Sequence, residues 1–578
     1  MSEPFVLDGE GRLSIGDIVR LARDPSTEVR RATTGPGLDR LDRTVALIAD
    51  AVEQGQAHVD DPDPEERRRH LVYGVTTGLG HNKNRPLASP EAAKQLQKNL
   101  IISHAAGIGI NTDPDDLNNY FAPEIVRALL MIRAAMFLQG YSGVRRELVD
   151  QQLGLLNAGV VPLIPKKGSV GSSGDLAPLS HLAQVLIGEG RALFEGEIVD
   201  GATALKRAGL KPYEPTYKEG LALTNGTTVA LATALFALHD AARLIRAADS
   251  LVAMSLEAML GPTRAFEPFV HRLRPHPGQI RSATNVRNAF QGSRLVNQSG
   301  EVQSLYSLRC APQVHGAAHE TWRHAAEVLT RELNAVTDNP LFDPDLKVED
   351  TLDGGSICRF NAFSAGNFHG EPVGFVMDFL AVAMSEIANL SERRIQMLLD
   401  RHTNGDLPQD LITDNGLNSG FMILQYSAAA LVSENKVLSH PASVDSIPTS
   451  SNAEDHVAMS PHASRKAGEI LGNAFSVLGI ELLAATQALC YRTGRLAFPK
   501  DAPGKTFEDE DLGAGTRAAF TRALDVFGHD GEPFTGIVRD DRAPAPLARE
   551  ARAALESDFA DQVSAACAGV AMLGLRSE

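Results

Sequence analysis

The chain has 578 residues, of which 55 are lysine or arginine and 72 are aspartate or glutamate, giving a formal net charge of −17 with histidine neutral. This acidic balance argues against a non-specific nucleic-acid binder or a protein that docks on anionic membranes, because both need an excess of basic side chains. Hydrophobic residues at 43% and charged residues at 22% are typical of a globular chain, and an aromatic content of 5% disfavours aromatic-rich all-β folds.

Helical spacing dominates the chain. Ser14 and Asp17 stand at the start of an apolar run and predict the capped beginning of an early helix. Further along, apolar side chains recur at steps of three and four or gather in Ala/Leu-rich stretches, as expected of long helices. The stretches that show this are 123–139, 227–260, 376–390 and 471–489. We therefore predict a mainly α fold with a long central helix bundle.

The most apolar long run, 470–490, contains Asn473, Glu481 and Gln487. These polar side chains favour a buried core helix over a membrane span. Residues 1–14 show no basic segment followed by an apolar run, so no secretory signal is predicted. The four cysteines form no CxxC pair, which indicates a reducing cytoplasm without a disulfide framework or a cysteine-based zinc site.

Three regions are predicted along the chain. Residues 1–222 form an N-terminal region, 223–498 the helix bundle, and 499–578 a C-terminal loop-rich and helical region. Within the last region, 499–548 is loop-rich and acidic and is expected to form a peripheral lobe or a tail insertion. Glycine, proline and turn-forming residues also gather in long segments between the helices, where functional sites tend to lie. These segments are 74–90, 159–178, 349–372 and 436–462.

The segment Gly168–His181 has the sequence GSVGSSGDLAPLSH, which permits a reaction of the main chain itself. The amide nitrogen of Gly174 can attack the carbonyl carbon of Ser172, because no Cβ blocks its approach. The carbonyl oxygen leaves as one water, and the hydroxyl of Ser173 leaves as a second. The product is a 4-methylidene-imidazol-5-one (MIO), an electrophile made from the chain. The alternative interpretation is a glycine-rich turn before a helix capped by Asp175.

This segment resembles the signature of the histidine and aromatic amino-acid ammonia-lyase and aminomutase family, which usually has Ala-Ser-Gly followed by Asp-Leu-Ala-Pro-Leu. Further segments across most of the chain are similar to motifs of the same family and follow in the same order. They are Tyr73–Gly80, Thr224–Thr227, Tyr306–Gln313, Thr337–Leu341, Gly366–Pro372, Glu392–Arg394 and Glu454–Val457.

The resemblance implies roles for the matching residues. Tyr73 is expected to remove the β-proton of the substrate, which requires neighbours that lower its pKa from about 10. Arg309 is expected to bind the substrate carboxylate through its planar guanidinium. Tyr306 would transfer a proton to or from the amine, and Asn225 would hold the ring carbonyl oxygen. The residues expected to line the electrophile and the substrate are Asn225, Tyr306, Gln313 and Phe368.

Two positions bear on the substrate side chain. The pair Ser103-His104 resembles the histidine enzymes, whereas tyrosine lyases tend to have His-Leu and phenylalanine lyases Phe-Leu. Glu454 stands where phenylalanine enzymes usually carry Gln, and a carboxylate can pair with an imidazole N–H. Beside a phenyl ring the same buried charge would lack a partner. Both positions favour L-histidine, deaminated to urocanate and ammonia, although either residue could instead be a structural polar group.

Three residues differ from the family pattern. Ser172 replaces the usual Ala, Ser304 replaces Asp in Gln-Asp-x-Tyr, and Ala453 replaces Gln before Glu454. They keep open a histidine 2,3-aminomutase, which would return the amine to the β-carbon and give β-histidine. A phenylalanine or tyrosine ammonia-lyase and a non-enzymatic relative that fails to form the ring are further alternatives.

The resemblance also implies an assembly. Family members are expected to form homotetramers in which three subunits share each active site, and no metal or diffusible cofactor is required. The long apolar stripes of the predicted bundle are compatible with such an assembly.

Overall fold

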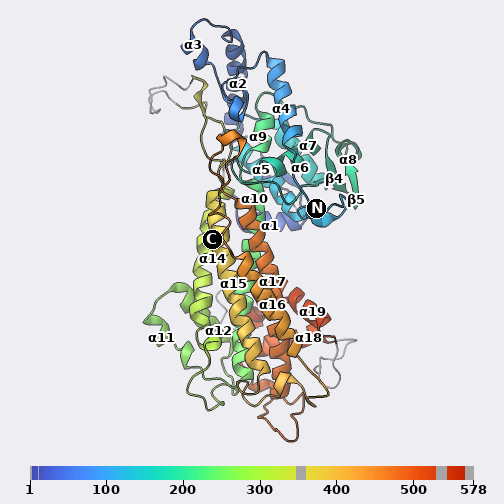
Figure 1. Cartoon of the computed structure of the whole chain (residues 1–578), viewed down its shortest axis with the longest axis vertical. Helices are drawn as coiled ribbons and strands as arrows, with labels where there is room; N and C mark the ends of the chain where they lie inside the picture. The colour runs from blue at the N-terminus through green and yellow to red at the C-terminus, as the bar shows by residue number, and fades with distance from the viewer. Residues whose placement is uncertain (1–2, 11, 347–358, 529–542, 567–578) are drawn as a thin grey trace. The chain divides into compact units, whose positions relative to one another are not determined.

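The structure is a computed structural model that describes residues 3–10, 12–346, 359–528 and 543–566, and the described part is mainly helical, as predicted (Figure 1). The chain divides into two compact units. Unit 1 comprises Met1–Phe236, Glu327–Met377 and Pro441–Arg465, and unit 2 comprises Ala237–Ala326, Asp378–His440 and Lys466–Glu578. The division falls within four long helices, which are α10 (Thr228–Ala258), α14 (Ala311–Leu333), α15 (Glu371–Leu399) and α17 (Ser460–Arg492).

Unit 1 contains a series of shorter helices whose beginnings follow from local sequence. Four of them begin at a proline, whose fixed φ and missing N–H suit the first helical turn. Ser14 caps the first helix as predicted, with its hydroxyl accepting from the Asp17 N–H at 3.1 Å. The helices are α1 (Ile15–Arg23), α2 (Pro36–Ala57), α3 (Pro64–Arg69), α4 (Pro90–His104), α5 (Pro123–Leu138), α6 (Arg146–Ala158), α7 (Leu176–Leu186), α8 (Gly201–Arg207) and α9 (Glu219–Thr224).

The strands described in unit 1 form small sheets. The strands β1 (Phe5–Leu7) and β2 (Val29–Arg31) pair in parallel, with Phe5 opposite Val29. The order of the antiparallel sheet is β3 (Val161–Pro162), β4 (Arg191–Phe194) and β5 (Glu197–Asp200). The strands β6 (Leu341–Phe342) and β7 (Ala362–Phe363) pair antiparallel. Helices supply most of the buried apolar residues of unit 1, and the strands add residues that include Leu7, Val29, Ala192, Phe194 and Phe342.

A buried arginine on α5 connects this helix to the junction of α9 and α10. Arg133 on this helix is fully buried, and burial lowers its pKa to about 10. Its Nη1 donates to the carbonyl oxygen of Asn225 and to Thr228 Oγ1, both at 3.0 Å. A buried guanidinium therefore satisfies polar groups where α9 ends and α10 begins.

Unit 2 contains the larger parts of the long helices α10, α14, α15 and α17. Buried polar contacts connect its long helices to one another. His315 Nδ1 on α14 lies 2.9 Å from Asp249 Oδ1 on α10, and Arg394 Nη2 on α15 donates to Glu481 Oε2 on α17 at 2.7 Å. The other helices assigned to this unit are α11 (Pro268–Arg272), α12 (Pro277–Ala289), α13 (Tyr306–Arg309), α16 (Met422–Leu438), α18 (Ala514–Phe527), α19 (Ala545–Glu556) and α20 (Phe559–Ala566).

Two predictions about the second half of the chain have different outcomes. The run 470–490 lies in α17, and 94% of the most apolar window of that helix is buried, as predicted for a core helix. By length and composition alone, α10, α15 and α17 could each cross a membrane. Of the loop-rich segment 499–548, residues 529–542 lie outside the described residues, and 514–527 form α18, which buries Phe520, Leu524 and Phe527.

Candidate active site

The predicted ring-forming triad lies in the loop before α7 and is fixed by main-chain contacts. Gly174 has a φ of +75°, and a Cβ at this position would lie 2.1 Å from the carbonyl oxygen of Gly226. The Gly226 N–H donates to the carbonyl oxygen of Ser173 at 3.3 Å, and the Asp175 N–H donates to the Gly226 oxygen at 2.8 Å. The space that a side chain would fill is thus occupied by backbone, and this arrangement fits a glycine whose nitrogen must enter a ring.

Asp175 anchors this loop to the start of α10. Its Oδ2 accepts the N–H groups of Val229 and Ala230 at 2.8 Å each, and Ser169 Oγ donates to its Oδ1 at 3.2 Å. Burial raises the pKa of Asp175 to about 6, although these hydrogen bonds favour the charged form. The predicted alternative role as the N-cap of α7 has no side-chain capping bond in support.

Glu454 contacts both serines of the triad. Ser172 Oγ donates to Glu454 Oε2 and Ser173 Oγ donates to Glu454 Oε1, each at 2.7 Å. Thr449 Oγ1 also donates to Oε2, at 2.9 Å, and the main chains of Thr449 and Glu454 pair at 2.9 and 3.3 Å. A carboxylate predicted to contact the substrate side chain therefore lies directly on the residues predicted to form the electrophile.

Tyr73 is half-buried in the loop between α3 and α4. Its Oη accepts the Gly80 N–H at 3.1 Å, which favours the phenolate. Burial nevertheless raises the pKa of Tyr73 above its ordinary value, and the charge of Glu454 raises it further. The neighbours of Tyr73 described within unit 1 thus do not supply the lowered pKa that the sequence analysis expected.

Ser103 and His104 occupy the last turn of α4. Ser103 is exposed, His104 is half-buried, and Ser103 Oγ lies 3.0 Å from His104 Nδ1. Burial lowers the pKa of His104, whereas the nearby charge of Glu454 raises it. Tyr73 and His104 therefore both lie within the electrostatic influence of Glu454.

Asn225 and Phe368 lie in two segments of unit 1 that contact the triad loop. Asn225 is buried at the end of α9, and its Nδ2 donates to the carbonyl oxygen of Asn339 at 2.8 Å. Phe368 is half-buried in the loop before α15. In that loop the Gly370 N–H donates to the carbonyl oxygen of Gly171 at 3.3 Å, so the loop of Phe368 contacts the triad loop.

Three predicted site residues belong to unit 2. Tyr306 begins α13 and is 70% exposed, and Arg309 Cζ lies 4.5 Å from the centre of its ring. Gln313 lies in the first turn of α14. Arg309 Nε and Gln313 Oε1 are buried atoms without a hydrogen-bond partner among the described residues. Such groups favour a further ligand, because a buried polar atom without a partner is costly.

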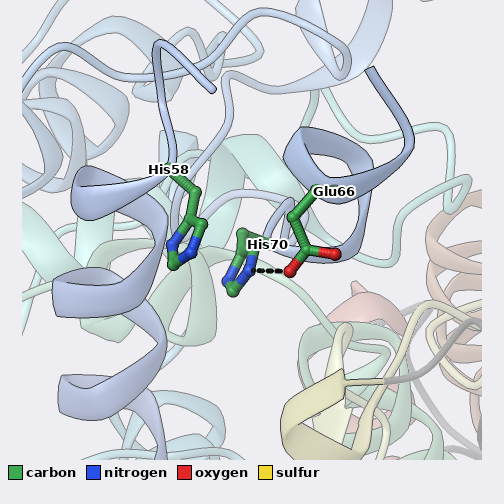
Figure 2. Close-up of side chains that lie close together, drawn as sticks. All are labelled: His58, Glu66 and His70. Atoms are coloured by element: carbon green, nitrogen blue, oxygen red, sulfur yellow. Dashed lines mark hydrogen bonds and ion pairs between the residues drawn. The ribbon is translucent and has the colours of Figure 1, made fainter. Parts of the chain in front are cut away.

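A polar cluster that the sequence analysis did not predict lies at the start of the Tyr73 loop. Figure 2 shows His58 beside α2, with Glu66 and His70 from α3 and its end. The His58 and His70 rings are stacked 3.8 Å apart and 6° from parallel, and His70 Nε2 lies 3.1 Å from Glu66 Oε1. Thr76 Oγ1 donates to the His70 carbonyl oxygen at 3.0 Å. One nitrogen of each ring and one carboxylate oxygen of Glu66 lie within 4.8 Å of one another, and the Thr76 bond connects this cluster to the Tyr73 loop.

Thr449 and Gly226 were also missed as contributors to the site. Gly226 stands in a segment similar to a family motif, but nothing in its spacing indicates that it packs against Gly174. Thr449 lies five residues before Glu454, and a lone threonine in a loop carries no signal of its own. Both contacts depend on chain pairing that the sequence does not display.

Similarity to known proteins identifies the family to which this chain belongs. Residues 13–520 match the aromatic amino acid lyase family, and the chain belongs to that family. It is similar to histidine ammonia-lyase of Caldanaerobacter subterraneus subsp. tengcongensis, with 47% identity over 85% of this chain and 88% of the relative. The predicted family is thereby confirmed.

Solved structures show the same fold. Histidine ammonia-lyase from Trypanosoma cruzi superposes with a TM-score of 0.78 at 34% identity, covering 99% of this chain and 98% of the other. Tyrosine aminomutase from Streptomyces globisporus superposes with a TM-score of 0.79 at 31% identity, covering 98% and 99%. The family thus includes relatives named for lyase and for aminomutase reactions.

Proposed function

We propose that this protein is a carbon–nitrogen lyase that converts L-histidine to urocanate and ammonia. The observation that carries the proposal is the Glu454 carboxylate, which lies on Ser172 and Ser173 and influences His104. A carboxylate at this place can accept the imidazole N–H of histidine, whereas a phenyl ring offers no donor to Oε1, the oxygen that loses the Ser173 hydroxyl when the ring forms. The identity of 47% to a relative named histidine ammonia-lyase supports the same substrate.

The proposed prosthetic group is MIO formed from Ser172, Ser173 and Gly174. The left-handed φ of Gly174 and the backbone that fills its Cβ position support this assignment. When formed, the group supplies an electrophile for the substrate amine, which no ordinary side chain offers. Asn225, which follows the last residue of α9, and Glu454 would hold the surroundings of the group in place.

The remaining roles are those of polar side chains around the substrate. Arg309 would bind the carboxylate, and its buried Nε without a described partner supports that role. Tyr73 would take the β-proton in its phenolate form. Tyr306 and Gln313 would contact the amine, and Phe368 would pack near the ring. Ser103 and His104 would face the substrate ring together with Glu454.

We also propose a homotetramer in which three copies contribute to each site. Large apolar side chains exposed on α15 and α16 support an assembly, because a subunit interface would cover them. Those on the part of these helices in unit 2 are Phe379, Val382, Met422, Ile423, Tyr426 and Val437, with exposures of 43% to 74%. A cytoplasmic location follows from the cysteine pattern and is proposed on that basis.

A histidine 2,3-aminomutase is the second candidate. Two observations support this candidate: the structural similarity to a tyrosine aminomutase, and the departures from the family pattern at Ser304 and Ala453. This reaction would use the same electrophile and the same base. It would differ in returning the amine to the β-carbon before the product leaves.

The test is to incubate purified full-length protein with L-histidine and to resolve the products by chromatography and mass spectrometry. We expect urocanate together with an equimolar amount of ammonia. A main product isobaric with histidine would establish the aminomutase instead. Unchanged histidine, from protein whose mass shows the loss of two waters, would contradict the substrate assignment.

A further inference from the structure

The hydroxyl of Ser172, where the family usually has alanine, has a defined partner. Ser172 is 4% exposed, and its Oγ donates to Glu454 Oε2 at 2.7 Å. Thr449 Oγ1 donates to the same oxygen at 2.9 Å. A carboxylate oxygen accepts through two lone pairs, so these two hydroxyls satisfy Oε2 completely.

The other oxygen of Glu454 changes its surroundings when the ring forms. In the unreacted chain, Ser173 Oγ donates to Oε1 at 2.7 Å. Ring formation removes the Ser173 hydroxyl as water. The Ser172 side chain is untouched, because only the carbonyl carbon of Ser172 enters the ring. Maturation therefore releases Oε1 from its hydroxyl donor and leaves both donors on Oε2.

We propose that Ser172, together with Thr449, is a positioning residue that fixes the Glu454 carboxylate so that Oε1 accepts the imidazole N–H of the substrate. The proposal rests on the proposed histidine activity. Two donors on one oxygen determine the rotation of the carboxylate, and a group held in advance binds its ligand without further ordering. A phenyl ring donates no N–H, so the contribution is confined to ligands that carry an imidazole.

The test compares two ligands that share an acrylate and differ in their ring. Urocanate carries an imidazole and cinnamate carries a phenyl group, and calorimetric titration of the mature full-length protein gives both Kd values. Ser172→Ala is expected to raise the Kd of urocanate about tenfold, as for the loss of a hydrogen bond to a charged group, with little effect on cinnamate. KM for L-histidine is expected to rise by a similar factor with little change in kcat.

Two further variants complete the design. Ser180→Ala is the matched control, because Ser180 is a buried serine on α7 whose hydroxyl donates to the Leu176 carbonyl oxygen at 2.8 Å. It is expected to leave both Kd values unchanged. Thr449→Val removes the second donor to Oε2 from outside the triad and is expected to weaken urocanate selectively. It carries the test if the intact mass shows that Ser172→Ala does not form the ring.

The outcomes separate this proposal from the proposed function. Equal weakening of urocanate and cinnamate in Ser172→Ala would overturn the positioning role, since it would show a general disturbance. Unchanged urocanate affinity in mature Ser172→Ala, or in Thr449→Val where Ser172→Ala does not mature, would also overturn it. Failure of the unsubstituted protein to form urocanate would contradict the proposed function itself.

Discussion

The surroundings of Tyr73 predict how the activity of the protein depends on pH. Burial and the Glu454 charge both raise its pKa, and the Gly80 N–H is the opposing contribution. The phenolate is the form that can take a proton, so its fraction grows as pH rises toward a pKa above 10. We therefore expect kcat/KM for L-histidine to rise with pH through the neutral and mildly alkaline range. A pH–rate profile measures this.

Tyr73→Phe provides the companion measurement. Loss of a positioned base is expected to lower kcat/KM by roughly 10² to 10⁴, whereas the mass loss of two waters should persist. A profile of the unsubstituted protein that reaches its plateau below pH 7 would contradict a raised pKa in the working enzyme. It would indicate that groups supplied on assembly lower the pKa of Tyr73.

Residue types at the site could be predicted from sequence, but their pairings could not. The motifs indicated a carboxylate at 454 and an electrophile at 172–174, more than 280 residues apart along the chain. That Ser172 and Ser173 each donate to a different oxygen of Glu454 follows from how two distant loops meet. The raised pKa of Tyr73 likewise depends on burial, which a loop sequence rich in glycine does not reveal.

The turn before α7 allows us to predict how a substitution at Gly174 affects ring formation and stability. Gly174→Ala places a Cβ 2.1 Å from the Gly226 oxygen on a backbone with φ of +75°. We expect the variant to retain both waters in its intact mass and to lose at least about 2 kcal/mol of unfolding free energy. Intact-mass analysis and denaturant unfolding measure the two effects.

Gly196 offers a matched control for this substitution. It stands between β4 and β5 with a φ of +82°, and a Cβ there would meet nothing within 4 Å. Gly196→Ala should therefore cost about 1 kcal/mol, the ordinary strain of this backbone region, and leave the ring intact. If Gly174→Ala also lost two waters, the contact with Gly226 would not be what makes glycine necessary.

Helices were predictable where their pattern was long, and less so where it was short. The steps of three and four in 471–489 correspond to α17, whose apolar window is 94% buried. The position of α18 within the predicted loop-rich and helical C-terminal region was not located, because glycine, proline and acidic residues surround its fourteen residues. Its apolar positions are spaced correctly, but the composition of the neighbouring segments obscured them.

For the whole molecule, the distribution of the predicted site over two units leads to a complementation experiment. Tyr73 belongs to unit 1 and Arg309 to unit 2. If different copies supply them, coexpressed Tyr73→Phe and Arg309→Lys chains form some sites with both native residues. Random assembly should restore about one quarter of the unsubstituted activity, whereas each variant alone stays nearly inactive.

The control for that experiment is the doubly substituted chain, Tyr73→Phe with Arg309→Lys, coexpressed with either single variant. No mixed site can then contain both native residues, and no activity should return. Light scattering of the same samples is expected to show a mass near four chains. Absence of recovery from the two single variants in mixed tetramers would place both residues of each site in one chain.

The backbone contact between Gly174 and Gly226 also helps to classify homologous genes. A Cβ at Gly226 would lie 2.8 Å from the Thr337 carbonyl oxygen, so neither glycine can be replaced without displacing main chain. A homologous gene that keeps the serine but encodes a larger residue at either position would specify a protein that folds around a defective turn. The two codons together therefore serve as a marker that separates genes for ring-forming enzymes from genes for inert relatives.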